Sequence, residues 1–428
     1  MAPVHSQSDT EIGHDAALMS VRRLIDVARQ AFVKNGFEAV SIDGLSRAAN
    51  VSKDTIYRHF DNKEALLNAT TEALGESYSR HVAGIAQRHL APEDALLAHG
   101  RAIIDASAEG GILSGVWLAA SNARDRPDFA VSLQRRYTRR LEPLRSAIAD
   151  ALPEGVMVPL EFAEDFGSLM VRGCRHIMGE PIESEATDRP APGNYGRSVI
   201  RLFLHGLEAA HPTGHRRLPP FPDAVRPPER PVRPAHIAKL IGVAATHFLQ
   251  RGYHQASLDQ IGEEAQVGRG TLYRHFQNKA GLFDAVMTER ACRIADQATW
   301  SCPPDGSPLG GLEACLESVA TILTSADSIA LHRVVIAEAN RLPDLAQRIY
   351  RTTRSPWMEA LQQWLGACVH ARALDMADPE LHAELLLILA IQGNRRIITG
   401  VPVSPMEGRD RAARISRMLF RGIIDARR

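Results

Sequence analysis

The sequence lacks the motifs of the main enzyme classes and of membrane-spanning proteins. It has no glycine-rich phosphate loop, no nucleophile turn of the hydrolase type and no His-Glu-x-x-His, and its 17 histidines are not spaced like metal ligands. Its longest apolar run, Leu385–Ile391, is far too short to cross a bilayer. We therefore expect a cytoplasmic protein that is not an enzyme and has no metal, cofactor or membrane partner.

Excess charge and paired cysteines are also missing. The 50 basic residues balance the 50 acidic residues, so contact with a nucleic acid would need local basic patches. The cysteines are five, an odd number, and none form a Cys-x-x-Cys. Cys174, Cys292, Cys302, Cys315 and Cys368 are therefore predicted to be free thiols in a reducing compartment.

Strand patterns are absent, and helical patterns are frequent. Aromatic residues make up 5% of the chain, and no segment alternates apolar and polar residues over a useful length. Val243–Phe248, Leu312–Leu323 and Leu381–Ile391 place apolar residues three and four positions apart. The sequence predicts an all-α fold, and 428 residues are too many for a single ordinary core.

One internal repeat dominates the chain. TIYRHFDNK at 55–63 returns as TLYRHFQNK at 271–279, and at this offset of 216 residues Val21–Leu67 lies over Ile237–Phe283 without a gap. The repeat is fainter further on: Gly206 lies over Gly422, and GCRHIMG at 173–179 resembles GNRRIITG at 393–400. Each half therefore has a well-matched head followed by a diverged helical body.

A proline-rich segment separates the halves. Eight of the 24 residues at 211–234 are proline, which predicts an extended, semi-rigid tether rather than a helix. The predicted domains are a disordered segment 1–17, head 1 at 18–66, body 1 at 67–210, the linker at 211–234, head 2 at 235–282 and body 2 at 283–428.

The first head has the pattern of a helix-turn-helix unit. Its first helix has an apolar face and ends at Asn35–Gly36, where glycine tolerates a left-handed cap. Ser41, Ser52 and Asn62 are predicted to cap the second, third and fourth helices. Within the third helix Ile56 and Phe60 should face the core, which turns its basic and hydroxyl-bearing residues outward.

The second head repeats the design with changes at the start of the third helix. Ser257 should cap the second helix in a capping box with Gln260, and Leu272 and Phe276 should face inward. Ser52-Lys53-Asp54 becomes Gly268-Arg269-Gly270. Because arginine offers guanine a bidentate fork and lysine does not, this change indicates either unequal half-sites or neutral drift.

These heads resemble the DNA-binding domain of TetR-family transcriptional regulators. The resemblance lies in the aromatic-and-glycine end of the first helix, the serine that opens the second, and the string V-S/G-x-x-T-hydrophobic-Y-x-H-F-x-N-K-x-x-L. It covers about 45 to 60 residues of each half. The resemblance implies two heads in successive major grooves of a double-stranded DNA operator, and helical bodies that dimerise and bind a small molecule.

By the resemblance, threonine, tyrosine, histidine and lysine would touch phosphates, while Lys53 and Arg269 would read bases. The candidate DNA-binding residues are Ser41, Ser52, Lys53, Thr55, Tyr57, Arg58, His59 and Lys63 in head 1, and Ser257, Arg269, Thr271, Tyr273, Arg274, His275 and Lys279 in head 2.

A small apolar or aromatic effector is the second expected partner. Candidate pocket residues are Trp117, Asn122, Tyr137, Arg172 and His176 in body 1, and His332, Asn340, Trp357, Trp364 and Asn394 in body 2. For each of them taken singly, packing or surface exposure is the competing interpretation.

We predict two tandem TetR-like units that form an intrachain pseudo-dimer and act as a ligand-responsive repressor. A further pairing of two chains stays open. The alternative is an effector-independent architectural or scaffold protein with one working head. Thermal stabilisation by small apolar compounds separates the two, because only a protein with a pocket should show it.

Overall fold

The computed structural model describes residues 7–108, 112–173, 178, 192–209, 218–224 and 233–425. Within these ranges the regular structure is helical, and the β-type pairing is limited to an isolated bridge between Glu208 and Leu374. The prediction of an all-α fold is confirmed.

The first half begins with the head helices and continues into its body. Its helices are α1 (Gln7–Ala39), α2 (Ile42–Ala49), α3 (Lys53–His59), α4 (Lys63–Val82), the short 3-10 helix η1 (Ala86–Arg88), α5 (Pro92–Ala108), α6 (Ile112–Asn122), α7 (Pro127–Arg140), α8 (Glu142–Asp150), α9 (Leu160–Met170) and α10 (Pro192–Leu204). α1 begins at Gln7, within the segment 1–17 that the sequence analysis expected to be disordered.

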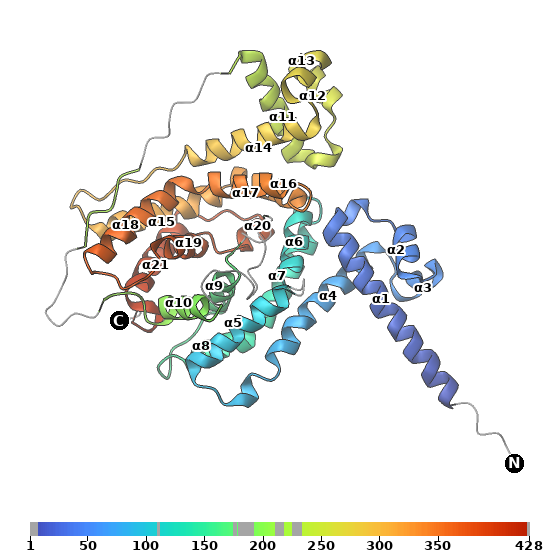
Figure 1. Cartoon of the computed structure of the whole chain (residues 1–428), viewed down its shortest axis with the longest axis horizontal. Coiled ribbons are helices and arrows are strands. Elements are labelled where there is room, and N and C mark those ends of the chain that lie inside the picture. The colour runs from blue at the N-terminus through green and yellow to red at the C-terminus, as the bar shows by residue number, and fades with distance from the viewer. Residues whose placement is uncertain are drawn as a thin grey trace.

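The second half repeats this order. Its helices are α11 (Ala235–Gln255), α12 (Leu258–Ala265), α13 (Arg269–Phe276), α14 (Lys279–Ala295), α15 (Pro308–Leu323), α16 (Ala326–Glu338), α17 (Pro343–Thr352), α18 (Ser355–His370), α19 (Pro379–Ala390), α20 (Arg395–Thr399) and α21 (Pro405–Asp425). Figure 1 shows the two heads at the outside of the molecule, with α4 and α14 leading from them to the bodies.

The two bodies pack on each other through equivalent helices. α6 packs on α16, α9 on α19 and α10 on α21, and each pair joins helices in matching places of the two halves. A contact between an element and its own counterpart is what a twofold axis produces. The chain therefore contains a pseudo-dimer, with α7 and α20 adding a further contact between the halves.

The linker is not a free tether over 218–224. Phe221 is buried and its ring lies 5.4 Å from that of Trp364 and 6.5 Å from that of Trp300. The indole nitrogens of these tryptophans donate to Pro219 O (3.0 Å) and Pro222 O (2.9 Å). Proline leaves its carbonyl free to accept, so this part of the linker docks on body 2.

Cys292, Cys302, Cys315 and Cys368 are free thiols, as predicted, and Cys174 lies outside the described residues.

No single helix of the described ranges is long and apolar enough to cross a membrane. The pair α15 and α16 passes by length and composition alone, with a bend of 61° between its two helices.

Candidate nucleic-acid interface and body cavity

The caps predicted for head 1 are present. Ser41 Oγ accepts from Gly44 N at 3.1 Å at the start of α2, and Ser52 Oγ accepts from Thr55 N at 3.1 Å at the start of α3. Asn62 Oδ1 accepts from Ala65 N at 2.8 Å at the start of α4. Asn50 joins α2 to α3 with a left-handed φ of 51°, which asparagine tolerates better than most residues. These contacts fix the orientation of α3 relative to α2.

Head 2 has the same geometry with one difference from the prediction. Ser257 Oγ accepts from Gln260 N at 3.4 Å, so the serine half of the capping box forms. The amide oxygen of Gln260 instead accepts from Arg251 at 2.7 Å. The prediction that the Gln260 side chain completes the capping box is therefore wrong. Gly268 precedes α13 without a side-chain cap.

Both recognition helices, α3 and α13, bury the predicted face. Ile56 and Leu272 are buried at 1% and 2% exposure, whereas Tyr57 and Tyr273 are 52% and 49% exposed. Such exposure of a large aromatic ring is unusual, because burying it would remove apolar area from water. The further residues of this outward face, all exposed, are Arg58, His59, Arg274 and His275.

The threonines lie at the edge of this face. Thr55 and Thr271 are half-buried, and the Thr55 hydroxyl lies 2.8 Å from that of Ser52.

The two candidate base readers make the same ion pair. Lys53 Nζ lies 2.5 Å from Asp43, and an Arg269 guanidinium nitrogen lies 2.7 Å from Asp259. The hydrogen bond and the charge of Asp43 raise the pKa of Lys53. All four side chains are more than half exposed, so the pairs contribute little to stability. They hold each cation at the start of its recognition helix.

Lys63 and Lys279 point into the heads rather than away from them. Lys63 Nζ donates to Val40 O at 2.8 Å, and Lys279 Nζ donates to His254 O at 3.0 Å. Burial lowers the pKa of both lysines. Their ammonium groups bind the backbone at the end of the first head helix.

Each lysine also covers an aromatic ring that sequence analysis did not single out. Lys63 and Arg126 lie 4.1 and 3.9 Å from the centre of the Phe37 ring. In head 2, Lys279 and Arg341 lie 4.8 and 4.0 Å from the centre of the Tyr253 ring. The arginines belong to the bodies, so two cation–π contacts on one ring join each head to its body. We call these the Phe37 clamp and the Tyr253 clamp.

Each body also reaches the head of the other half. Asn340 Nδ2 donates to Val33 O of α1 at 2.7 Å. Arg124 holds the equivalent place in body 1, and its guanidinium lies against Gly252 of α11, where an added Cβ would be 2.6 Å away. Each body therefore contacts both heads.

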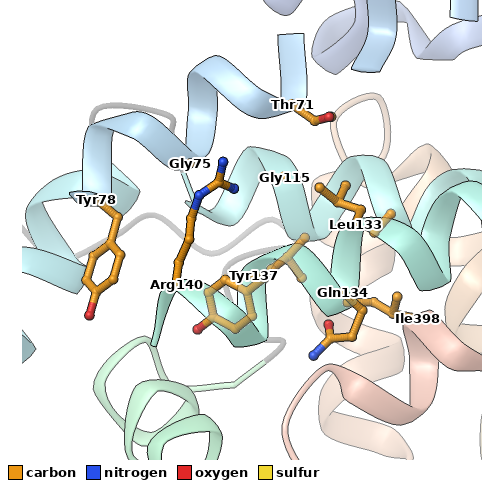
Figure 2. Close-up of a pocket in the computed structure, with 11 residues that line it drawn as sticks. Thr71, Gly75, Tyr78, Gly115, Leu133, Gln134, Tyr137, Arg140 and Ile398 are labelled. Atoms are coloured by element: carbon orange, nitrogen blue, oxygen red, sulfur yellow. The ribbon is translucent and has the colours of Figure 1, made fainter. Parts of the chain in front are cut away.

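Body 1 contains a small, partly open cavity of about 40 Å³. Its lining comes from α4, α6 and α7 and, from the other half, Ile398 of α20 (Figure 2). The lining residues are Thr71, Gly75, Tyr78, Gly115, Val116, Ala119, Leu133, Gln134, Tyr137, Arg140 and Ile398. This volume is well below the range typical of small-molecule sites, so a ligand larger than a water molecule would require the lining helices to move apart.

Polar groups are few at this cavity. The Tyr78 hydroxyl is buried and has no hydrogen-bond partner among the described residues, and burial raises the pKa of Tyr78 well above its usual value. Arg140 lies 2.5 Å from Glu72, a carboxylate that it shares with Arg136 at 2.7 Å. Figure 2 shows the Arg140 side chain between the rings of Tyr78 and Tyr137. A buried donor without a partner is costly, so a bound acceptor would stabilise it.

Tyr137 is the sequence-derived pocket candidate that lines this cavity. The other described candidates of body 1 lie elsewhere. Trp117 Nε1 donates to Ile336 O of the second half at 2.8 Å, and Asn122 Nδ2 donates to Leu118 O at 2.8 Å. Arg172 lies 5.1 Å from the centre of the Tyr195 ring, and His176 is outside the described residues.

The body 2 candidates serve packing in this structure. Trp357 Nε1 donates to Ser318 Oγ at 3.1 Å, and Asn394 Nδ2 donates to Gly173 O of the first half at 3.3 Å. Trp364 holds the linker and Asn340 holds α1, as described above. His332 lies in a buried network with Ser328 and Arg354. The polar groups that suggested a pocket here instead bind backbone carbonyls and neighbouring side chains.

Comparison with known proteins agrees with this geometry. The family model described as bacterial regulatory proteins, tetR family, matches residues 24–70 and 240–286, and the model described as AefR-like transcriptional repressor, C-terminal domain, matches residues 310–421. The first model therefore matches both heads, and the second model matches body 2.

The similar proteins are transcriptional regulators that align with about one half of this chain or less. The HTH-type transcriptional repressor KstR2 of Mycolicibacterium smegmatis is 30% identical over 154 residues, which is 32% of this chain and 68% of that protein. The uncharacterised HTH-type transcriptional regulator YhgD of Bacillus subtilis is 28% identical over 155 residues, covering 36% of this chain and 80% of that protein. A solved putative TetR-family regulator from Mesorhizobium loti has a TM-score of 0.38 at 21% identity, covering 44% of this chain and 97% of that one. The chain thus belongs to the TetR family of bacterial transcriptional regulators and carries two of the family's DNA-binding heads in one polypeptide.

Proposed function

We propose that this regulator is a ligand-responsive repressor in which a single chain reads both halves of one operator. The observation that carries the proposal is the preservation of the outward face in both heads. Tyr57 and Tyr273 are exposed to nearly the same extent, and each is followed by an exposed arginine and histidine. A head that had lost its role would have no reason to keep large aromatic and cationic side chains in water.

In this proposal the phosphate contacts come from polar residues on and beside the recognition helices. Ser41 and Thr55, with their counterparts Ser257 and Thr271, offer hydroxyl donors near helix N-termini, which favour anions. Further along the recognition helices, Tyr57 and His59, with Tyr273 and His275, add hydroxyl and imidazole donors. Arg58 and Arg274 add charge. The ammonium groups of Lys63 and Lys279 are bound to carbonyls within the heads, so we assign these two residues to holding the heads in place.

Base reading falls to Lys53 and Arg269 at the helix starts. Each is held by an aspartate of the preceding helix, which limits the rotamers that the side chain must lose on binding DNA. Since arginine binds guanine in a bidentate manner and lysine does not, the two half-sites are expected to differ in sequence. A fused chain can accept such an asymmetric operator, whereas a homodimer presents two identical heads.

The effector site in this proposal is the cavity of body 1. Its lining is mostly apolar, and its unpartnered donor is the Tyr78 hydroxyl. These features suit a small apolar or aromatic molecule that carries one hydrogen-bond acceptor and that enters when the lining helices move apart.

The equivalent space in body 2 is filled by larger side chains. Thr71, Gly75 and Gly115 correspond at the repeat offset to Met287, Ala291 and Leu331, all of which are 0% exposed. We therefore expect one effector molecule per chain.

The route from effector to the second head runs through α20. Ile398 of this helix lines the cavity, and the carbonyls of Ile397 and Ile398 accept from Arg333 of α16 at 2.7 and 2.9 Å. α16 packs against α11 of head 2 and against α6. An effector that binds one arrangement of α20 better than another would shift both heads.

Selection of bound duplexes from random DNA tests the proposal. Two unlike half-sites at a fixed spacing are expected, and Arg269→Ala should relax base preference in one of them by about 1–3 kcal/mol. A single short site, with Tyr273→Ala without effect on affinity, would contradict two working heads.

A screen of small aromatic compounds by thermal shift tests the effector site. Compounds that stabilise the wild type should lose their effect in Gly115→Leu, which copies Leu331 of body 2 and fills the cavity. Stabilisation that persists in this variant would place the ligand elsewhere.

A further inference from the structure

Several contacts between the two bodies are symmetric. Gly206 and Gly422 lie at equivalent places and each meets the backbone of the other half. Gly173, after α9, lies against Ile388 of α19, and Gly393, after α19, lies against Ser168 of α9. These two contacts are equivalent across the interface. An interface built only from such contacts would fit two copies of the same half as well as it fits the two different halves.

The symmetry is broken where α21 crosses α9. Arg411 is buried, with its side chain 2% exposed, and its guanidinium lies 2.6 Å from Asp165 of α9, whose side chain is 11% exposed. One turn away, Arg414 lies 2.6 Å from Glu161. The first half supplies both carboxylates and the second half supplies both guanidinium groups.

The equivalent positions carry no charge. Arg411 corresponds to Tyr195 at the repeat offset. Each residue donates to an equivalent carbonyl of its own half: Tyr195 Oη to Leu169 O, and Arg411 Nε to Leu389 O. Ser198 corresponds to Arg414.

On the acidic side, aligning Gly173 with Gly393 places Leu385 at the position of Asp165 and Leu381 at that of Glu161. Leu385 is 0% exposed. The ion pairs are therefore present on one side of the pseudo-twofold axis and replaced by uncharged residues on the other.

We propose that Asp165–Arg411 and Glu161–Arg414 form a selectivity key, which makes the first half of a chain pair with a second half and not with a copy of itself. In a pair of two second halves, each Arg411 would face Leu385 and remain buried without a carboxylate. In a pair of two first halves, Asp165 would face Tyr195 without a cation. Burial of an unpaired charge is strongly unfavourable, whereas the mixed pair satisfies both groups.

The consequence is a chain that is complementary to itself only through its two different halves. This inference is independent of the proposed operator and effector, because it concerns only which bodies meet. It disfavours assemblies in which like halves of two chains pair, which identical halves would allow.

Native mass spectrometry of a nicked chain tests the key. A protease site is inserted within residues 225–232, the folded chain is cut, and the product is mixed with an isotope-labelled copy. The mixture is unfolded in urea and refolded, and the masses of the pairs are counted. The mixed first–second pair is expected to exceed either like pair by at least ~100-fold. A statistical ratio of 1:2:1 for first–first, first–second and second–second pairs would overturn the proposal.

A quadruple variant separates the key from the shape of the rest of the interface. The variant gives each of the four positions the residue of its counterpart: Glu161→Leu, Asp165→Leu, Arg411→Tyr and Arg414→Ser. The ratio of mixed to like pairs should then move toward the statistical value. Retained selectivity in this variant would show that the ion pairs are not the cause. Arg409→Ser is the matched control, because Arg409 pairs with Glu317 inside the second half, and it should leave the ratio unchanged.

If the quadruple variant does not fold, charge reversal at the more exposed pair, Glu161–Arg414, provides a second test. Glu161→Arg in the first half should reduce pairing with a wild-type second half, and Arg414→Glu in the second half should restore it. Absence of this restoration would also overturn the proposal.

Discussion

Gly206 and Gly422 are reciprocal contacts across the pseudo-twofold axis. A Cβ on Gly206 would lie 2.3 Å from the carbonyl of Phe420, and a Cβ on Gly422 would lie 2.0 Å from the carbonyl oxygen of Leu204. Their φ angles are +72° and +63°, which side chains other than glycine rarely adopt. The backbone bond from Leu207 N to Leu419 O, 2.7 Å long, depends on this approach.

Gly206→Ala and Gly422→Ala should each separate the bodies. We expect a loss of stability of about 2–4 kcal/mol from steric overlap and backbone strain, measured by urea unfolding. Gly366→Ala is the control, because a Cβ there meets nothing within 4 Å, and it should be neutral or slightly stabilising. Equal and small effects for all three variants would contradict the close approach.

Lys63→Met tests the role of the Phe37 clamp. The variant keeps the apolar stem and loses the charge that binds Val40 O and the Phe37 ring, so DNA affinity should fall because the head is less well fixed. The slope of log affinity against log salt should stay unchanged, since no phosphate contact is removed. A slope lower by about 1 would instead show that Lys63 neutralises a phosphate.

Phe221→Ala tests the docking of the linker. Removing the ring from its contacts with Trp300 and Trp364 should destabilise body 2 by about 3–5 kcal/mol and change the tryptophan fluorescence of the folded chain. Met157→Ala, at a side chain that is 82% exposed, is the control and should do neither. Wild-type stability in Phe221→Ala would show that 218–224 is a free tether after all.

His332 should make the stability of body 2 sensitive to acid. Its ring accepts from Arg354 at 3.2 Å and binds Ser328 O at 2.7 Å, and burial together with Arg354 lowers its pKa to about 3. The unfolded chain takes up this proton near pH 6.5, so folding free energy is lost as the pH falls from about 6.5 toward 3.

Urea unfolding of the wild type and of His332→Gln at pH 7 and pH 5 measures this effect. The wild type should lose about 2 kcal/mol more than the variant between these two pH values. His99, whose pKa burial lowers to about 4, contributes equally to both proteins. The same loss in both would contradict a neutral, buried His332.

Local signals explain why the heads were predictable. Ser41, Ser52 and Asn62 cap helices through bonds to residues three positions away, and such short-range geometry is encoded by residue type and spacing. The burial of Ile56 and the exposure of Tyr57 follow from helical periodicity in the same way.

Long-range partners explain what the sequence left unpredicted. Arg126 and Arg341 reach equivalent rings from positions that do not align at the repeat offset, so comparison of the two halves could not pair them. Trp364 and Asn394 looked like pocket residues by type, but their partners are Pro219 and Gly173, 145 and 221 residues away. Among the candidates that the structure describes, only Tyr137 lines the cavity, because the shape of a cavity depends on the packing of whole helices.

The stoichiometry of the complex with operator DNA tests the central claim most directly. Light scattering of the purified complex gives its mass, and footprinting of the same complex shows how many half-sites are protected. One chain of 46.9 kDa per duplex, with both half-sites protected, is the result that the account predicts. Two chains per duplex, or protection of a single half-site by one chain, would contradict it.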